Sequence, residues 1–217
     1  SSDALLNGTD NIAIGRLAFS ASTDGADNIA IGRSALAVSG NDGDTNIAIG
    51  LSALGTGDVA GAGNIGIGAS ALAAVTSGTN NIGVGLTAAD ALLTGTDNVA
   101  IGRLAFSAST DGADNIAIGR SALAVSGNDG DTNIAIGLAA LGTGDVAGAG
   151  NIGIGASALT ALTGGTNNIA MGLTSADALL GGTDNVAIGR LSFSASTDGA
   201  DNIAIGRSAL AVSGNDA

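Results

Sequence analysis

The segment Asn11-Ile12-Ala13-Ile14-Gly15 occurs twelve times in this chain with only conservative exchanges. Its asparagines are 17 or 18 residues apart, in steps of 17, 18, 18, 17 and 17, and the series then begins again. Five steps make 87 residues, and a shift by that length superimposes the sequence on itself nearly without change. The chain is therefore a repeat within a repeat, with five coils in one cassette. The asparagines are Asn11, Asn28, Asn46, Asn64, Asn81, Asn98, Asn115, Asn133, Asn151, Asn168, Asn185 and Asn202.

A period below twenty residues is typical of a solenoid, which grows by adding coils. Side chains alternate along a strand, so Ile12 and Ile14 share one face, which we expect to be the core. Asn11, Ala13 and Gly15 are then expected on the opposite, outer face. Helix is disfavoured because the chain holds 38 glycines.

A second short apolar run follows the pentapeptide, at residues 17–19 in the first coil, and predicts a second strand or arc. A loop of Gly, Asp, Asn, Ser and Thr closes the coil, as expected for turns. The sequence therefore predicts an all-β, parallel β-solenoid of the β-roll type. It would have about twelve coils of 17–18 residues and a five-coil super-repeat of 87 residues.

The repeats indicate one continuous array over residues 1–217, with super-repeats at 11–97, 98–184 and, in part, 185–217. Residues 1–6 match residues 88–93, so the chain is expected to begin in the middle of a coil. This pattern favours a fragment of a longer fibre, whose targeting and anchoring signals would lie elsewhere.

The composition argues against several classes of function. The chain has no Cys or His, so the usual general bases, thiol nucleophiles and transition-metal ligands are missing, and we expect neither an enzyme nor a bound cofactor. The net charge of −13 argues against binding nucleic acid through its phosphates. No apolar run approaches the length of a transmembrane helix, so no membrane span is expected in this segment.

The repeated asparagines are predicted to form a structural ladder, in which stacked amides hydrogen-bond along the axis or cap the turn. Each coil contributes only a few large apolar side chains, so a single chain would have a thin core. A column of small residues on the expected outer face would allow another chain to approach closely, and we therefore predict homo-oligomerisation. That column is Ala13, Ala30, Ala48, Gly66 and Gly83.

All six arginines directly follow the glycine of the pentapeptide and occur in pairs of neighbouring coils. Two stacked guanidinium groups about 5 Å apart repel each other unless something neutralises them. One interpretation is a solvated pair with counterions. The other is an interchain bridge to the acidic loops of a neighbouring chain. The interchain contact candidates are Arg16, Arg33, Arg103, Arg120, Arg190 and Arg207.

The acidic loops also raise the question of calcium. Asp24 and Asp27 lie one coil away from Asp42 and Asp44, so hard oxygen ligands could converge there. Asp and Asn are also ordinary turn residues, and the full glycine-rich nonapeptide of calcium-binding β-rolls is absent. Solvated turns are therefore the favoured interpretation, and a calcium-stabilised binding module is the alternative.

The units NIAIGRSALA and NIGIGASALA resemble the head repeats of trimeric autotransporter adhesins in bacterial and phage surface fibres. The resemblance covers the whole chain and implies a left-handed parallel β-roll, a homotrimer, and a place at a cell or virion surface. We therefore expect a self-associating structural component of an extracellular or virion-surface fibre that serves extension, display or attachment. A second alternative is an adhesin whose exposed loops recognise a host or surface receptor.

Overall fold

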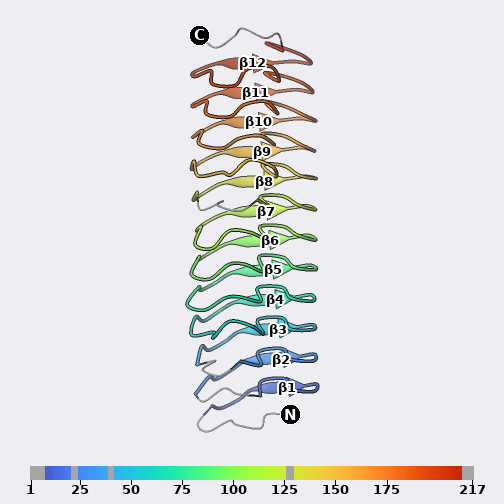
Figure 1. Ribbon diagram of the computed structural model, residues 1–217, viewed down its shortest axis with the longest axis vertical. Coiled ribbons are helices and arrows are strands. Elements are labelled where there is room, and N and C mark those ends of the chain that lie inside the picture. The colour runs from blue at the N-terminus through green and yellow to red at the C-terminus, as the bar shows by residue number, and fades with distance from the viewer. Residues whose placement is uncertain (1–7, 21–23, 39–41, 126–129, 212–217) are drawn as a thin grey trace.

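The computed structural model describes residues 8–20, 24–38, 42–125 and 130–211, and shows a straight rod built around one parallel sheet (Figure 1). The sheet has twelve strands in sequence order, and the predicted all-β solenoid is confirmed. The half-coil expected at residues 1–6 lies outside the described residues. The strands are β1 Ile12–Ile14, β2 Ile29–Ile31, β3 Ile47–Ile49, β4 Ile65–Ile67, β5 Ile82–Val84, β6 Val99–Ile101, β7 Ile116–Ile118, β8 Ile134–Ile136, β9 Ile152–Ile154, β10 Ile169–Met171, β11 Val186–Ile188 and β12 Ile203–Ile205.

Each strand pairs only with the strands of the coils before and after it, in an unbroken register. Ile12 pairs with Ile29, and Ile29 pairs with Ile47. The same register continues to β12, where Val186 pairs with Ile203. Because every coil returns to the same place one strand spacing further on, equivalent residues form straight columns along the rod.

The predicted orientation of the strands is wrong. The middle residue of each strand faces the interior, and Ala30, Ala48 and Ala100 are completely buried. The flanking residues face outward: Ile14 is 59% exposed at the end of the rod, and Ile101 is still 39% exposed in its middle. The small-residue column proposed as the contact with another chain is therefore part of the core.

The inversion has two physical causes. The interior is too narrow for a large side chain on the sheet, since even a Cβ added to Gly83 would lie 2.9 Å from Leu72 Cγ. The buried asparagines also require the interior, because they bond to backbone groups there. Side chains two residues apart share a face. When the asparagine of the pentapeptide points inward, the alanine two residues later therefore also points inward, and both isoleucines point outward.

The other wall of each coil is an arc rather than a second strand. In the first coil Leu17 and Phe19 adopt left-handed conformations, with φ of 59° and 50°, which break the strand geometry. Neighbouring arcs are nevertheless hydrogen-bonded, as between Phe19 N–H and Ala35 O at 2.8 Å. The arcs supply the bulk of the core, with Phe19, Phe106, Phe193, Leu36, Leu54, Leu72, Leu123, Leu141 and Leu159 fully buried.

The core keeps its volume where the arc carries a small residue. Ala89 and Ala176 take the place that Phe or Leu holds in other coils. In those two coils Leu92 and Leu179, three residues later, are fully buried instead. Each coil thus fills its own layer, as close packing requires.

Candidate interaction surface

The sheet carries an apolar surface along the length of the rod. The first and third residues of strands β1 to β12 form two outward columns of Ile and Val, with one Met, which we call the isoleucine face. Further exposed apolar side chains adjoin this face along the edge where the strands end, among them Leu51, Leu86, Leu138 and Leu173. Large apolar patches on a protein surface occur at sites that bind proteins, membranes or ligands, so the isoleucine face is the candidate interaction surface.

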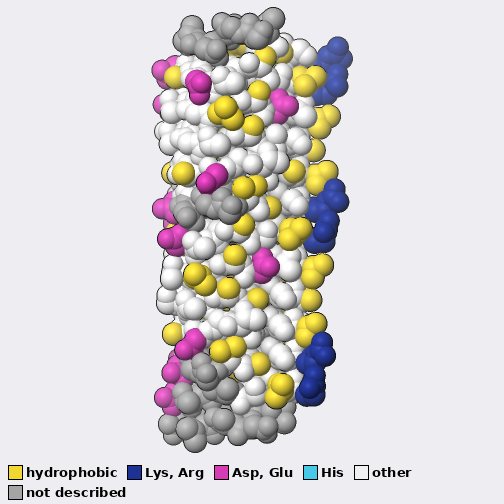
Figure 2. Space-filling view, in the orientation of Figure 1, with side chains coloured by type: hydrophobic (Ala, Val, Ile, Leu, Met, Phe, Trp, Pro, Cys, Tyr) yellow, Lys and Arg dark blue, Asp and Glu magenta, His cyan; other side chains and the backbone are white. Residues whose placement is uncertain are grey.

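The six arginines also lie along the edge where the strands end, and all are exposed. Figure 2 shows them as three separate groups along one edge of the rod, with apolar side chains between the groups. The order along this edge in the first cassette is Arg16, Arg33, Leu51, Ala69 and Leu86. The isoleucine face is thus bordered by positive charge at regular intervals, and an interchain ion pair remains a prediction.

The predicted calcium ligands take part in bonds between coils. Asp44 Oδ1 accepts a hydrogen bond from the Ala26 N–H at 2.8 Å, and Asp42 Oδ1 accepts one from the Asp24 N–H at 3.3 Å. Asp27 is exposed and precedes the buried asparagine of its coil. Within the described ranges, no three acidic side chains come together in a group that could hold a metal ion.

The asparagines form a hydrogen-bonded ladder through the interior. Asn98 is representative: its Oδ1 accepts the Asn115 N–H at 3.0 Å, and its Nδ2 donates to Gly112 O at 2.6 Å. The same Nδ2 lies 3.0 Å from Asn81 Oδ1 in the preceding coil. Asn98 is almost completely buried, so each bond replaces one that water would make in the unfolded chain. The ladder ties the start of each strand to both the coil before and the coil after it.

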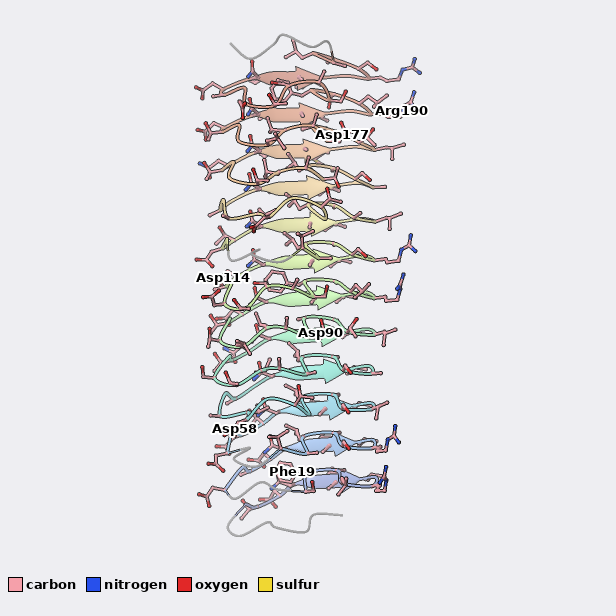
Figure 3. The ribbon with its side chains drawn as sticks, viewed as in Figure 1. Phe19, Asp58, Asp90, Asp114, Asp177 and Arg190 are labelled. Carbon is pink, nitrogen blue, oxygen red and sulfur yellow. The ribbon has the colours of Figure 1, made fainter. Side chains whose placement is uncertain are left out.

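Two carboxyl groups lie in less favourable surroundings, and sequence reasoning did not single them out. Asp90 and Asp177 occupy equivalent places in successive cassettes, just after the arc (Figure 3). Burial raises the pKa of both carboxyl groups above the ordinary value, and a hydrogen bond from their own backbone partly opposes it. Asp177 Oδ1 is buried and accepts no hydrogen bond within the described part of the chain.

Replacing both residues by asparagine, Asp90→Asn with Asp177→Asn, is expected to raise the melting temperature at pH 7. A carboxyl group whose pKa is raised by folding stabilises the protein only in its protonated form, and this contribution disappears as pH rises through the folded pKa. The gain over the natural chain should therefore shrink as pH falls toward 4. Thermal unfolding followed by far-ultraviolet circular dichroism would measure both effects.

The matched control is Asp58→Asn with Asp145→Asn, which removes the same two charges from exposed positions of the two cassettes. An equal rise in melting temperature for the control pair would show that net charge, rather than burial, is responsible.

Searches for related proteins returned no match: no family model fits the chain, and no curated protein or solved structure is similar to it. Across the described residues, no helix is long and apolar enough to cross a membrane.

Proposed function

We propose that this chain is a structural component of an extracellular or virion-surface fibre that associates with copies of itself for extension, display or attachment. The observation that carries the proposal is the isoleucine face, which presents two columns of large apolar side chains over all twelve strands. Such a face is stabilised when it is covered, because apolar area removed from water contributes favourably. The resemblance of the repeats to adhesin heads supports the surface location.

The dimensions of the rod suit this role. Twelve strands at about 4.8 Å give a length of roughly 55 Å, and the same coil is repeated without interruption of the sheet. A solenoid of this kind serves as a spacer whose length is set by the number of coils. The nearly identical cassettes give each contact surface a regular repeat along the rod.

The proposal predicts that four substitutions on the isoleucine face convert an oligomer into a monomer. The variant carries Ile49→Thr, Ile67→Thr, Ile118→Thr and Ile136→Thr, which keep a β-branched side chain but remove apolar surface. Losing about 1 kcal/mol per side chain should raise the dissociation constant at least about a hundredfold. Analytical ultracentrifugation would compare the masses with the 20.2 kDa of one chain.

The control variant is Leu93→Thr with Leu180→Thr, since these leucines are exposed apolar side chains that lie outside the sheet. It should associate as the natural chain does. A natural chain that sediments as a monomer at all concentrations would refute the proposal.

A further inference from the structure

Two columns of opposite charge border the isoleucine face. Six aspartates directly precede a ladder asparagine, and we call them the Asp column; the six arginines form the Arg column. All twelve side chains are exposed. Each aspartate shares its coil with one arginine, in the pairs Asp10 with Arg16, Asp27 with Arg33, Asp97 with Arg103, Asp114 with Arg120, Asp184 with Arg190 and Asp201 with Arg207.

The two members of a pair cannot meet within one chain. Five residues lie between them, and the six residue steps span about 20 Å, with the strand in the middle. Figure 3 shows Asp114 and Arg190 on opposite edges of the rod. In Figure 2 acidic side chains gather on one edge at the same heights as the three arginine groups on the other. The charges are therefore separated across the sheet but matched in height.

Backbone conformation alone does not explain the aspartates. Their position is left-handed, with φ of 58° at Asp27, and Asp, Asn and Gly adopt that conformation most readily. The coils without arginine satisfy the same requirement with Thr45, Gly63 and Asn80. The position thus accepts several residues, and it carries a negative charge in the coils that carry an arginine.

We infer that a second copy of this chain covers the isoleucine face with its own, running in the same direction and in register, so that each Asp column meets the partner's Arg column. The inference rests on the self-association proposed above. When the second rod is rotated by half a turn about its long axis, the two rods still run in the same direction, but their strands cross the contact in opposite directions. The Arg edge of the second rod then lies opposite the Asp edge of the first, at equal height. A closed ring of three copies obeys the same rule.

The charge pattern disfavours the other arrangements. In an antiparallel pair the first coil faces the twelfth, and the charged coils are distributed so that every Asp then faces an Asp and every Arg an Arg. A parallel pair shifted by two coils places arginines opposite Thr, Gly or Asn. A shift of five coils also restores the charge match, and it brings seven of these twelve coils into contact. Like charges in close opposition are costly, so among the arrangements that overlap all twelve of these coils the charge pattern favours the parallel, in-register pair.

The surface is large enough for a stable contact. The area between the two columns is about 1,100 Å² on each copy, above the roughly 800 Å² per partner of ordinary interfaces. Facing sheets pack about 10 Å apart, a gap that an arginine and an aspartate side chain can bridge together. The apolar face supplies the affinity and the charged borders supply the alignment.

Chemical cross-linking tests the arrangement, because the chain has no cysteine of its own. Thr45 and Leu51 border the strand of one coil at its two edges, and both are exposed. Chains with Thr45→Cys are mixed with chains with Leu51→Cys, one of them carrying a mass tag, and treated with a short bifunctional maleimide. The mixed product should exceed either product of identical chains several-fold.

Two further mixtures represent the alternatives. Thr45→Cys with Asn167→Cys reports the antiparallel pair, and Thr45→Cys with Leu138→Cys reports the five-coil shift. A higher yield from either mixture, or equal yields from all, would overturn the inference. These results would leave the proposed function intact, because it requires only that chains associate. A monomeric natural chain would refute both.

A charge variant separates the two roles of the surface. Changing the six aspartates of the Asp column to asparagine keeps the left-handed conformation, which Asn80 already adopts with φ of 58°. This variant should still associate through its isoleucine face but lose the several-fold preference for the Thr45–Leu51 cross-link. An unchanged preference would show that the charges do not set the register.

Discussion

Replacing Gly102 by alanine is expected to destabilise its part of the rod by at least about 3 kcal/mol. Gly102 follows β6 with φ of 135°, a conformation that residues with a side chain rarely adopt. A Cβ built at this position would also lie 2.6 Å from Gly119 O in the next coil. The rigid backbone of that coil cannot withdraw without breaking its own bonds, so strain and steric clash act together.

The effect should be local, because each coil contacts mainly its neighbours. Native-state hydrogen exchange, read by mass spectrometry, would reveal faster exchange in the coils of β6 and β7 than in those near β10. Gly164→Ala is the control, since a Cβ there meets nothing within 4 Å. Comparable exchange in the two variants would contradict the role assigned to Gly102.

Replacing Asn98 by aspartate is the second change with a large expected effect, about 3–5 kcal/mol at neutral pH. The substitution conserves shape but replaces the Nδ2 donor by an oxygen. That oxygen would face Gly112 O and Asn81 Oδ1, which lie 2.6 Å and 3.0 Å from Nδ2. Two favourable hydrogen bonds thereby become repulsive contacts, and a charge is buried without a counterion.

Protonation would restore one donor, so the loss of stability in Asn98→Asp should diminish as pH falls, which a series of thermal melts would show. The neighbouring Asn80→Asp is the matched control. Asn80 is exposed, donates one hydrogen bond to Asp97 at 3.1 Å, and stands where other coils carry aspartate. Because Asn80 is exposed, a carboxylate there can turn away from Asp97 into water, so the substitution should change stability by no more than about 1 kcal/mol. Equal destabilisation at the two positions would show that the buried ladder contributes no more than a surface contact.

The sequence predicted where each strand lies but not which way it faces. The recurrence of the pentapeptide located all twelve strands, since each begins directly after its asparagine. Alternation shows that Ile12 and Ile14 share a face without telling which face is inside. Hydrophobicity favoured burying them, yet interior space and hydrogen bonding determined the outcome, and both depend on residues far along the chain. The distance from Gly83 to Leu72 Cγ, for example, becomes visible only once the coil is closed.

The contact surface proposed from the structure differs from the one expected from the sequence for the same reason. The arginines were recognised as interchain candidates because their pairing in adjacent coils is visible in the sequence. The apolar partner surface was assigned to Ala13, Ala30 and Ala48, which the structure places in the interior. With the strands facing the other way, the isoleucines become the exposed surface and the charges become its borders.

The orientation of the strands also determines how the rod would respond to tension. The strands lie across the rod, so the hydrogen bonds between coils run along its length (Figure 1). A force that pulls on the two ends of the chain would break the hydrogen bonds between coils one coil at a time. Each released coil frees 17 or 18 residues, about 60 Å of contour in place of about 5 Å of rod. The rod would therefore lengthen in steps, and the tension on it would fall each time one coil opens.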